Sequence, residues 1–242
     1  MSSIEEAVRA IRNARPRRIV ALTGAGVSAD SGIPTFRGAG GLWRNFRAED
    51  LATPEAFRRD PAMVWEWYEW RRKLIREAKP NAAHEALARL PAAVSVTQNV
   101  DGLHARAGSR EVVELHGSIL RVRCVAEGTR QLREEPFDTI PPHCDECGAL
   151  LRPDVVWFGE ALSEEALARA AMVVHATDLL LVIGTSGVVY PAAGFVTMHT
   201  GLSIEINPEA SAVSSACTFA IAERAAVAVP PLVDAILEGL QS

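Results

Sequence analysis

A glycine-rich turn near the start of the chain has the residue types that approach a phosphate group. The segment Gly24-Ala-Gly-Val-Ser-Ala29 follows an apolar run that ends at Thr23, and it has the pattern G-x-G-x-x-A. In that setting Gly24 allows a tight turn, Gly26 lets the backbone approach a pyrophosphate, and Ala29 permits close packing of the following helix. The acidic residue that normally contacts a ribose, about 20 residues further on, is missing. The turn therefore predicts either an atypical nucleotide site or a plain structural turn.

Three cysteines are spaced for metal binding. Cys144 and Cys147 form the C-x-x-C half of a zinc ribbon, and Cys124 precedes them in the same stretch. A structural zinc site normally has four ligands, so either His143, Glu127 or water completes the set, or the site holds no metal. Any metal here is expected to be structural. The whole chain has only four cysteines, which argues against a disulfide framework.

An aromatic helical segment carries two polar residues of interest. Residues 65–72 include three of the five tryptophans, which predicts that part of the segment fills a core. Tyr68 and Arg71 are three residues apart, so on a helix they share one face. A phenol and a guanidinium on one face can hold a carboxylate. The alternative is that Arg71 is a solvated surface residue beside Arg72.

Short apolar runs without alternation predict strands that are buried on both faces of a parallel sheet. The predicted strands are Ile19–Thr23, Ala93–Thr97, Val112–Leu115, Leu179–Ile183 and Leu202–Ile206. The predicted helices are Ile4–Ala14, the segment capped by Asn81, Glu164–Val174 and Pro231–Leu240. Alternating strands and helices indicate an α/β fold. Two stretches interrupt the alternation, because residues 33–79 are mostly helical and residues 121–155 are rich in Pro and Cys.

Composition narrows the class of protein. The chain has 242 residues, of which 48% are apolar and 23% charged, as expected of one or two globular domains. A net charge of −5 argues against a dedicated nucleic-acid binder. No run approaches the ~18 apolar residues that a membrane helix needs, and the first residues lack the pattern of a signal peptide. We therefore expect no nucleic-acid partner, no membrane and a cytoplasmic location.

Six segments in this order resemble the sirtuin family of NAD-dependent protein deacylases. They are GAGVSADSGIPTFRG (24–38), TQNVDGLH (97–104), ELHG (114–117), VVWFGE (155–160), GTS (184–186) and EIN (205–207). The resemblance implies NAD as a co-substrate rather than a hydride carrier, a structural zinc ion, acyl-lysine proteins or peptides as partners, and a monomer. It also explains why no acidic residue follows the glycine turn as a ribose contact, since Asn207 resembles the family's contact to the adenosine ribose.

The resemblance further implies a division of the chain. A Rossmann-like parallel sheet forms a large NAD-binding domain of residues 1–32, 81–120 and 156–242. A smaller domain combines a helical module, residues 33–80, with a zinc-ribbon-like module, residues 121–155.

The implied catalytic residues are His116 and Asn99. His116 matches the general base that acts on the ribose hydroxyls, and an imidazole suits this role because it titrates near neutral pH; in isolation it would instead be interpreted as a structural histidine. Gln98 and Asn99 resemble contacts to the nicotinamide ribose, and Asp101 resembles a contact to the carboxamide. The other implied NAD-binding residues are Gly24, Ala25, Gly26, Ser28, Ala29, Ile33, Phe36, Arg37, Trp43, Val100, Gly184, Thr185, Ser186, Asn207, Pro208, Glu209 and Ala225.

Two features concern the acylated substrate. The segment 155–160 resembles a strand that pairs with the substrate backbone, with an ordinary edge strand as the alternative. Its implied contacts are Val155, Val156, Phe158, Gly159 and Glu160. The Y-x-x-R spacing of Tyr68 and Arg71 resembles class III sirtuins, which remove succinyl, malonyl and glutaryl groups. We therefore expect desuccinylation with weaker deacetylation.

Three other functions compete with this interpretation. An ADP-ribosyltransferase would share the residues that cleave nicotinamide from its ribose. A non-catalytic NAD-binding scaffold would keep the fold, although the presence of His116, Asn99 and Asp101 argues against it. The glycine turn alone would also suit a dehydrogenase.

Overall fold

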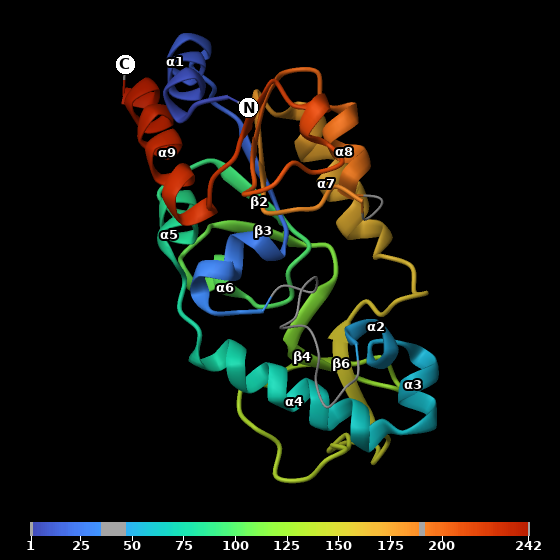
Figure 1. Ribbon diagram of the computed structural model, residues 1–242. Helices are drawn as coiled ribbons and strands as arrows, with labels where there is room; N and C mark the ends of the chain where they lie inside the picture. The colour runs from blue at the N-terminus through green and yellow to red at the C-terminus, as the bar shows by residue number, and fades with distance from the viewer. Residues whose placement is uncertain (1, 35–46, 189–191, 242) are drawn as a thin grey trace.

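A computed structural model describes residues 2–34, 47–188 and 192–241 of the chain (Figure 1). Its larger sheet has six parallel strands in the order β3-β2-β1-β7-β8-β9. The strands are β1 Ile19–Thr23, β2 Ala93–Thr97, β3 Glu111–Glu114, β7 Leu179–Ile183, β8 Leu202–Ile206 and β9 Phe219–Ile221. The α/β fold and five strands are confirmed, with β3 one residue earlier than predicted. Every residue of β1 and β7 is buried, as expected for strands that are covered on both faces.

Helices cover both faces of this sheet, as Figure 1 shows. On one face α1, α5 and α9 pack against Ile19 and Ala21, and on the other α7 and α8 pack against Val20 and Leu22. Successive strand residues point to opposite faces, so one apolar run serves both layers. The helices are α1 Ile4–Ala14, α5 Ala82–Ala88, α7 Glu164–Ala176, α8 Ala192–Met198 and α9 Ala225–Gln241. Asn81 caps α5 as predicted, because its side chain accepts a hydrogen bond from the Ala83 N–H at 3.0 Å.

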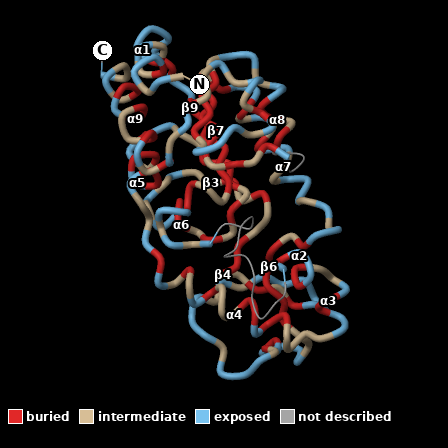
Figure 2. The backbone as a smooth tube through the Cα atoms, in the orientation of Figure 1, coloured by how far each residue is buried: buried red, intermediate tan, exposed pale blue. Residues whose placement is uncertain are grey.

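A second, smaller sheet is antiparallel and has the order β5-β4-β6. It lies beside three helices that come from the predicted helical stretch. These elements are β4 Gly117–Cys124, β5 Arg130–Leu132, β6 Leu151–Val155, α2 Ala48–Leu51, α3 Pro54–Arg59 and α4 Pro61–Glu77. Trp65, Trp67 and Trp157 are buried in the core between them. Figure 2 shows buried residues running through both sheets.

Three predicted elements differ in the structure. The helix after the glycine turn is a 3-10 helix, η1 Ala25–Ser31. Helix α9 begins at Ala225 rather than at Pro231, so two prolines lie inside it. The strand expected over 155–160 is wrong beyond Val155, because β6 ends there and the chain turns back through Gly159, whose φ is +86°.

Two shorter helical segments lie in the large-sheet part of the chain, α6 Leu103–Arg106 and η3 Ser214–Ala216. In the part of the chain that the structure describes, no helix has both the length and the apolar character to cross a bilayer.

Candidate active site

The carboxyl ends of the large sheet bring the predicted nucleotide-binding segments to one edge. The register pairs Thr23 with both Thr97 and Ile183, and Ile183 with Ile206, so β1, β2, β7 and β8 end side by side. Open α/β sheets bind ligands at this edge. The segments that follow these strands, including η1, contain the predicted residues Gly24, Ala25, Gly26, Ser28, Ala29, Gln98, Asn99, Val100, Asp101, Gly184, Thr185, Ser186, Asn207, Pro208 and Glu209.

The glycines in these loops allow two backbones to approach closely. The Gly26 N–H donates to the Gly184 carbonyl at 2.9 Å. A side chain at Gly26 would lie 2.6 Å from the Gly184 Cα, and one at Gly24 would lie 2.8 Å from the Gly184 oxygen. The reason given for Ala29 is wrong, since this residue is exposed rather than packed between helix and strand; Val27 and Ser28 point inward instead.

His116 lies two residues beyond β3, at the same edge of the sheet. Its Nδ1 is 2.8 Å from the Gln98 carbonyl oxygen. A carbonyl can only accept, so Nδ1 carries the proton and a neutral ring leaves Nε2 as the acceptor. Burial lowers the pKa of His116, which the Gln98 carbonyl partly counteracts. The arrangement therefore favours a neutral imidazole with a free basic nitrogen near neutral pH.

The backbone on either side of His116 is also held. The His116 carbonyl accepts from the Val156 N–H at 2.9 Å. Gly117 follows with a φ of +76°, and a side chain there would lie 2.1 Å from the Asp154 carbonyl oxygen. Only glycine fits this left-handed, crowded position, so the turn that orients His116 depends on Gly117.

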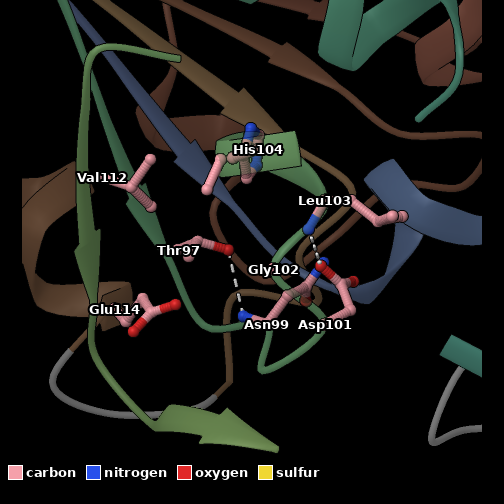
Figure 3. A pocket seen from close by; sticks show the side chains of 9 residues that line it. Thr97, Asn99, Asp101, Gly102, Leu103, His104, Val112 and Glu114 are labelled. Atoms are coloured by element: carbon pink, nitrogen blue, oxygen red, sulfur yellow. Dashed lines mark hydrogen bonds between the residues drawn. The ribbon is translucent and has the colours of Figure 1, made fainter. Parts of the chain in front are cut away.

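A buried polar network connects the loops after β1 and β2. The Ser28 hydroxyl donates to Asp101 at 2.7 Å, and the Asn99 amide donates to the Ser28 hydroxyl at 3.1 Å and to the Gly24 carbonyl at 3.2 Å. Asn99 and Asp101 also line a small pocket between this loop and β3 (Figure 3). The hydrogen bonds through Ser28 therefore hold the predicted NAD contacts Asn99 and Asp101 in a fixed position relative to each other.

Two histidines adjoin this network, and sequence reasoning assigned no site role to His84. Its Nδ1 accepts from the Asn81 N–H at 3.3 Å, and its Nε2 lies 3.5 Å from the Ser28 hydroxyl. Burial lowers the pKa of His84. Burial, with His84 nearby, lowers the pKa of His104 to about 3. Both rings are therefore neutral at pH 7. His84 lies in a regular amphipathic helix, and the presence of a histidine there did not by itself indicate a contact with the site.

The loops after β7 and β8 meet at Thr185. The Gln98 amide donates to the Thr185 hydroxyl at 3.0 Å, and the Asn207 amide donates to the Thr185 carbonyl at 3.2 Å. Pro208 and Glu209 are exposed beyond Asn207, whereas Ala225 is buried at the start of α9. Of the other predicted contacts, Ile33 is half-buried. Phe36, Arg37 and Trp43 lie outside the described residues.

Tyr68 and Arg71 lie on α4, and Tyr68 belongs to the core beside the smaller sheet. Tyr68 is only 1% exposed, and its hydroxyl accepts from the Trp157 indole N–H at 2.9 Å. Burial raises the pKa of Tyr68 to about 12, so the phenol keeps its proton. The half-buried Arg71 has its guanidinium carbon 5.1 Å from the centre of the Trp67 ring. Burial lowers the pKa of Arg71, while the nearby Tyr68 and Asp101 oppose the shift.

The turn after β6 is tied to Arg152. Its guanidinium donates to Glu160 at 2.6 and 2.8 Å and stacks 3.4 Å from the centre of the Trp157 ring. Glu160 also accepts from the Trp157 N–H at 2.9 Å. These contacts fix the indole that donates to Tyr68. Among the predicted peptide contacts, Phe158 is 52% exposed, and β6 is an edge strand of its sheet.

Comparisons with known proteins agree with this geometry. Residues 24–191 match the pattern of the Sir2 family. The chain belongs to the Sir2 family. It is 52% identical over 236 residues to the protein named NAD-dependent protein deacylase 2 of Pyrobaculum aerophilum, across 95% of each chain.

Solved structures of the Sir2 family share the fold at high identity. A complex of a Sir2 homologue with NAD has a TM-score of 0.91 and 45% identity, and the match covers 98% of this chain and 94% of that one. A mutant Sir2 homologue in complex with 2′-O-acetyl ADP ribose has a TM-score of 0.92 and 44% identity, with 100% and 99% covered.

In this Sir2 chain the three predicted cysteines converge between β4 and β6. The sulfur atoms of Cys124, Cys144 and Cys147 all lie within 4.8 Å of one another, and those of Cys124 and Cys147 are 3.5 Å apart. Zinc–sulfur bonds of ~2.3 Å at tetrahedral angles place sulfurs about 3.8 Å apart, so the cluster has the size of a zinc site. Backbone N–H groups of Glu127 and Ala126 lower the pKa of Cys124, whereas, against the lowering effect of the Ala149 backbone, Cys124 and Cys144 raise the pKa of Cys147 to about 11, so zinc binding would have to release that thiol proton.

Proposed function

We propose that this Sir2-family chain is an NAD-dependent protein-lysine deacylase. In this reaction NAD and one water molecule are consumed, nicotinamide is released, the acyl group is transferred to ADP-ribose and the lysine is left as a free amine. The names of its relatives and the ligands of its structural neighbours support the proposal. The observation that carries it is the orientation of His116, which presents an unprotonated Nε2 at the carboxyl edge of the sheet.

His116 acts as the general base in this proposal. The acyl oxygen of the lysine substrate displaces nicotinamide from C1′ of the ribose, and His116 Nε2 takes a proton from a ribose hydroxyl. Its lowered pKa keeps the base unprotonated near neutral pH. Asn99 assists at the reacting ribose, where its position is set by Gly24 and Ser28.

The NAD-binding residues are proposed from the resemblance and from their place at the edge of the sheet. Gln98 and Asn99 contact the nicotinamide ribose, and Asp101 contacts the carboxamide. The network with Ser28 supports this assignment, since it holds Asn99 and Asp101 in place before NAD binds. The adenosine half lies against Gly184, Thr185, Ser186, Asn207, Pro208, Glu209 and Ala225.

The preferred acyl groups in our proposal are succinyl, malonyl and glutaryl, with weaker removal of acetyl. The indole N–H of Trp157 donates to the Tyr68 oxygen, so the Tyr68 proton is left to donate elsewhere. The nearby Arg71 guanidinium supplies a positive charge. Together they offer a neutral donor and a cation to an acyl carboxylate.

Binding of the substrate peptide is assigned to the segment 155–160. Because β6 is an edge strand that ends at Val155, an added strand can pair with that end with little side-chain selectivity, and the turn that follows would contact the peptide beside it. The residues concerned are Val155, Val156, Phe158, Gly159 and Glu160.

We also propose that the chain is a monomer. We propose that its large NAD-binding domain consists of residues 1–32, 81–120 and 156–242, and its smaller domain of residues 33–80 and 121–155.

A structural zinc ion is proposed at Cys124, Cys144 and Cys147. The spacing of their sulfur atoms supports it. Such an ion contributes folding free energy by joining β4 to the segment before β6.

Product analysis tests the proposed reaction. The protein is incubated with NAD and one lysine peptide carrying acetyl, succinyl, malonyl or glutaryl, and nicotinamide and O-acyl-ADP-ribose are measured by mass spectrometry. The proposal predicts equal amounts of both products and the fastest turnover for the acidic acyl groups. Nicotinamide release without acyl transfer would indicate an ADP-ribosyltransferase, and no release would indicate an NAD-binding scaffold.

A further inference from the structure

Two turns carry the cysteine cluster, and they have the same backbone geometry. The first is Cys124-Val-Ala-Glu127-Gly128 and the second is Cys144-Asp-Glu-Cys147-Gly148. In each, the N–H of the final glycine donates to the carbonyl of the first cysteine at 2.9 Å. The two glycines have φ values of +71° and +73°.

The hydrogen bonds just outside the two turns also correspond. The Cys124 N–H donates to the Thr129 carbonyl at 2.9 Å, and the Cys144 N–H donates to the Ala149 carbonyl at 2.7 Å. The two turns are therefore equivalent position by position. Glu127 occupies in the first turn the position that Cys147 occupies in the second.

This equivalence bears on the missing fourth ligand. The fourth residue of the second turn sends its sulfur toward Cys124, at 3.5 Å. By the same backbone geometry, the Cα–Cβ bond of the fourth residue of the first turn has the direction from which a side chain can reach the shared centre. Glu127 is exposed, so its side chain can change rotamer without disturbing the core. Its carboxylate extends two bonds further than a thiol, which requires the side chain to fold back toward the sulfurs.

The other candidates for the fourth ligand fit less well. His143 precedes Cys144 in an extended bridge to Leu150, and neighbouring side chains of an extended segment point to opposite sides. Cys217 packs against the core on the α7 and α8 face of the large sheet. Among the described residues only the three cysteines have ligand atoms that converge, so His143, Cys217 and the present rotamer of Glu127 all lie outside the cluster.

We infer that Glu127 completes the zinc site through its carboxylate, which gives three sulfur ligands and one oxygen ligand in place of four thiolates. Carboxylate oxygen binds zinc at about 2.0–2.2 Å. It is a harder ligand than thiolate, and soft sulfur ligands favour zinc. The site should therefore hold zinc less tightly than the same site with a cysteine at 127.

Metal titration of the full-length protein tests this inference. Zinc affinity is measured by competition with a chelator, and the donor set is read from the visible spectrum after replacement of zinc by Co²⁺. We expect one zinc per chain and a Co²⁺ spectrum of three sulfur donors and one oxygen donor. Glu127→Ala should weaken zinc binding by about tenfold or more, since even loss of an outer-shell partner has that effect. Glu127→Cys should tighten binding and shift the spectrum to that of four thiolates.

Glu146→Ala is the matched control, because Glu146 is an exposed acid at the third position of the second turn. It should change neither the spectrum nor the affinity. The inference is wrong if Glu127→Ala keeps the wild-type spectrum and affinity, if Glu146→Ala weakens binding equally, or if the protein binds no zinc. These measurements need neither NAD nor peptide, so their failure leaves the proposed deacylase reaction untouched. An inactive protein with the expected spectrum would instead contradict the proposed reaction alone.

Discussion

Arg71→Met should lower the preference of the enzyme for succinyl over acetyl peptides. Methionine keeps much of the apolar stem and removes the charged guanidinium, whose central carbon lies 5.1 Å from the centre of the Trp67 ring. Acetyl-lysine has no carboxylate, so its turnover should change little. Succinyl-lysine should lose a charge-assisted hydrogen bond with a partly desolvated cation.

The size of the effect follows from the surroundings of Arg71. The side chain is half-buried, and its pKa is lowered by burial, so its charge is less screened by water than that of a surface arginine. Hydrogen bonds to charged groups contribute about 1.5–3 kcal/mol. Since about 1.4 kcal/mol corresponds to tenfold, the ratio of kcat/KM for succinyl to acetyl peptide should fall about tenfold to a hundredfold.

The assay uses one peptide sequence with the two acyl groups, at saturating NAD. Lys73→Met is the matched control, since Lys73 is an exposed cation on the same helix. It removes the same charge and should leave the ratio unchanged. An unchanged ratio for Arg71→Met, or an equal fall for Lys73→Met, would refute the assignment of Arg71 to the acyl carboxylate.

Three further predictions follow from buried groups. The acid limb of the kcat/KM profile should have its midpoint below the ordinary histidine value of 6.5, because burial lowers the pKa of His116 and only the neutral ring accepts a proton; a midpoint above that value would contradict the assignment. Between pH 6.5 and about 3 the unfolded chain binds a proton that native His104 does not, so this group should lower the free energy of unfolding by about 1.4 kcal/mol per pH unit as pH falls. When the free energy of unfolding is measured by denaturant titration at several pH values, its dependence on pH should be weaker for His104→Asn than for the wild type. The exposed control His143→Asn should show the wild-type dependence. Trp157→Phe should lower the free energy of unfolding by about 1–3 kcal/mol, because the buried Tyr68 hydroxyl loses its donor. The same substitution should cost less in a Tyr68→Phe background. Equal costs in both backgrounds would mean that this hydrogen bond contributes nothing to stability.

The sheet was predictable because its strands are continuous apolar runs that need cover on both faces. Leu179–Ile183 is entirely apolar, and the structure buries all five residues. Strand β9 escaped prediction because Phe219–Ile221 is too short for a pattern to stand out. The start of α9 was missed because Pro231 is typical of the first turn of a helix, whereas here the helix already begins at Ala225.

The individual site residues were predictable from the sequence, whereas the hydrogen bonds that join them were not. Motifs located Asn99, Asp101 and His116, which all lie within four residues of the end of a predicted strand. Sequence spacing gave no indication that Ser28 joins Asn99 to Asp101 or that His84 lies beside Ser28, since these contacts span segments far apart in the chain. The turn after Val155 also depends on a tertiary contact, between Arg152 and Glu160.

The most direct test of the account is the activity of His116→Ala. With wild-type and variant protein at equal concentration, NAD and a succinyl-lysine peptide, O-acyl-ADP-ribose is followed by mass spectrometry, and the exposed His143→Ala serves as the control. Loss of a general base should lower kcat by about a hundredfold or more, while His143→Ala stays active. A His116→Ala variant that retains wild-type turnover would contradict the account.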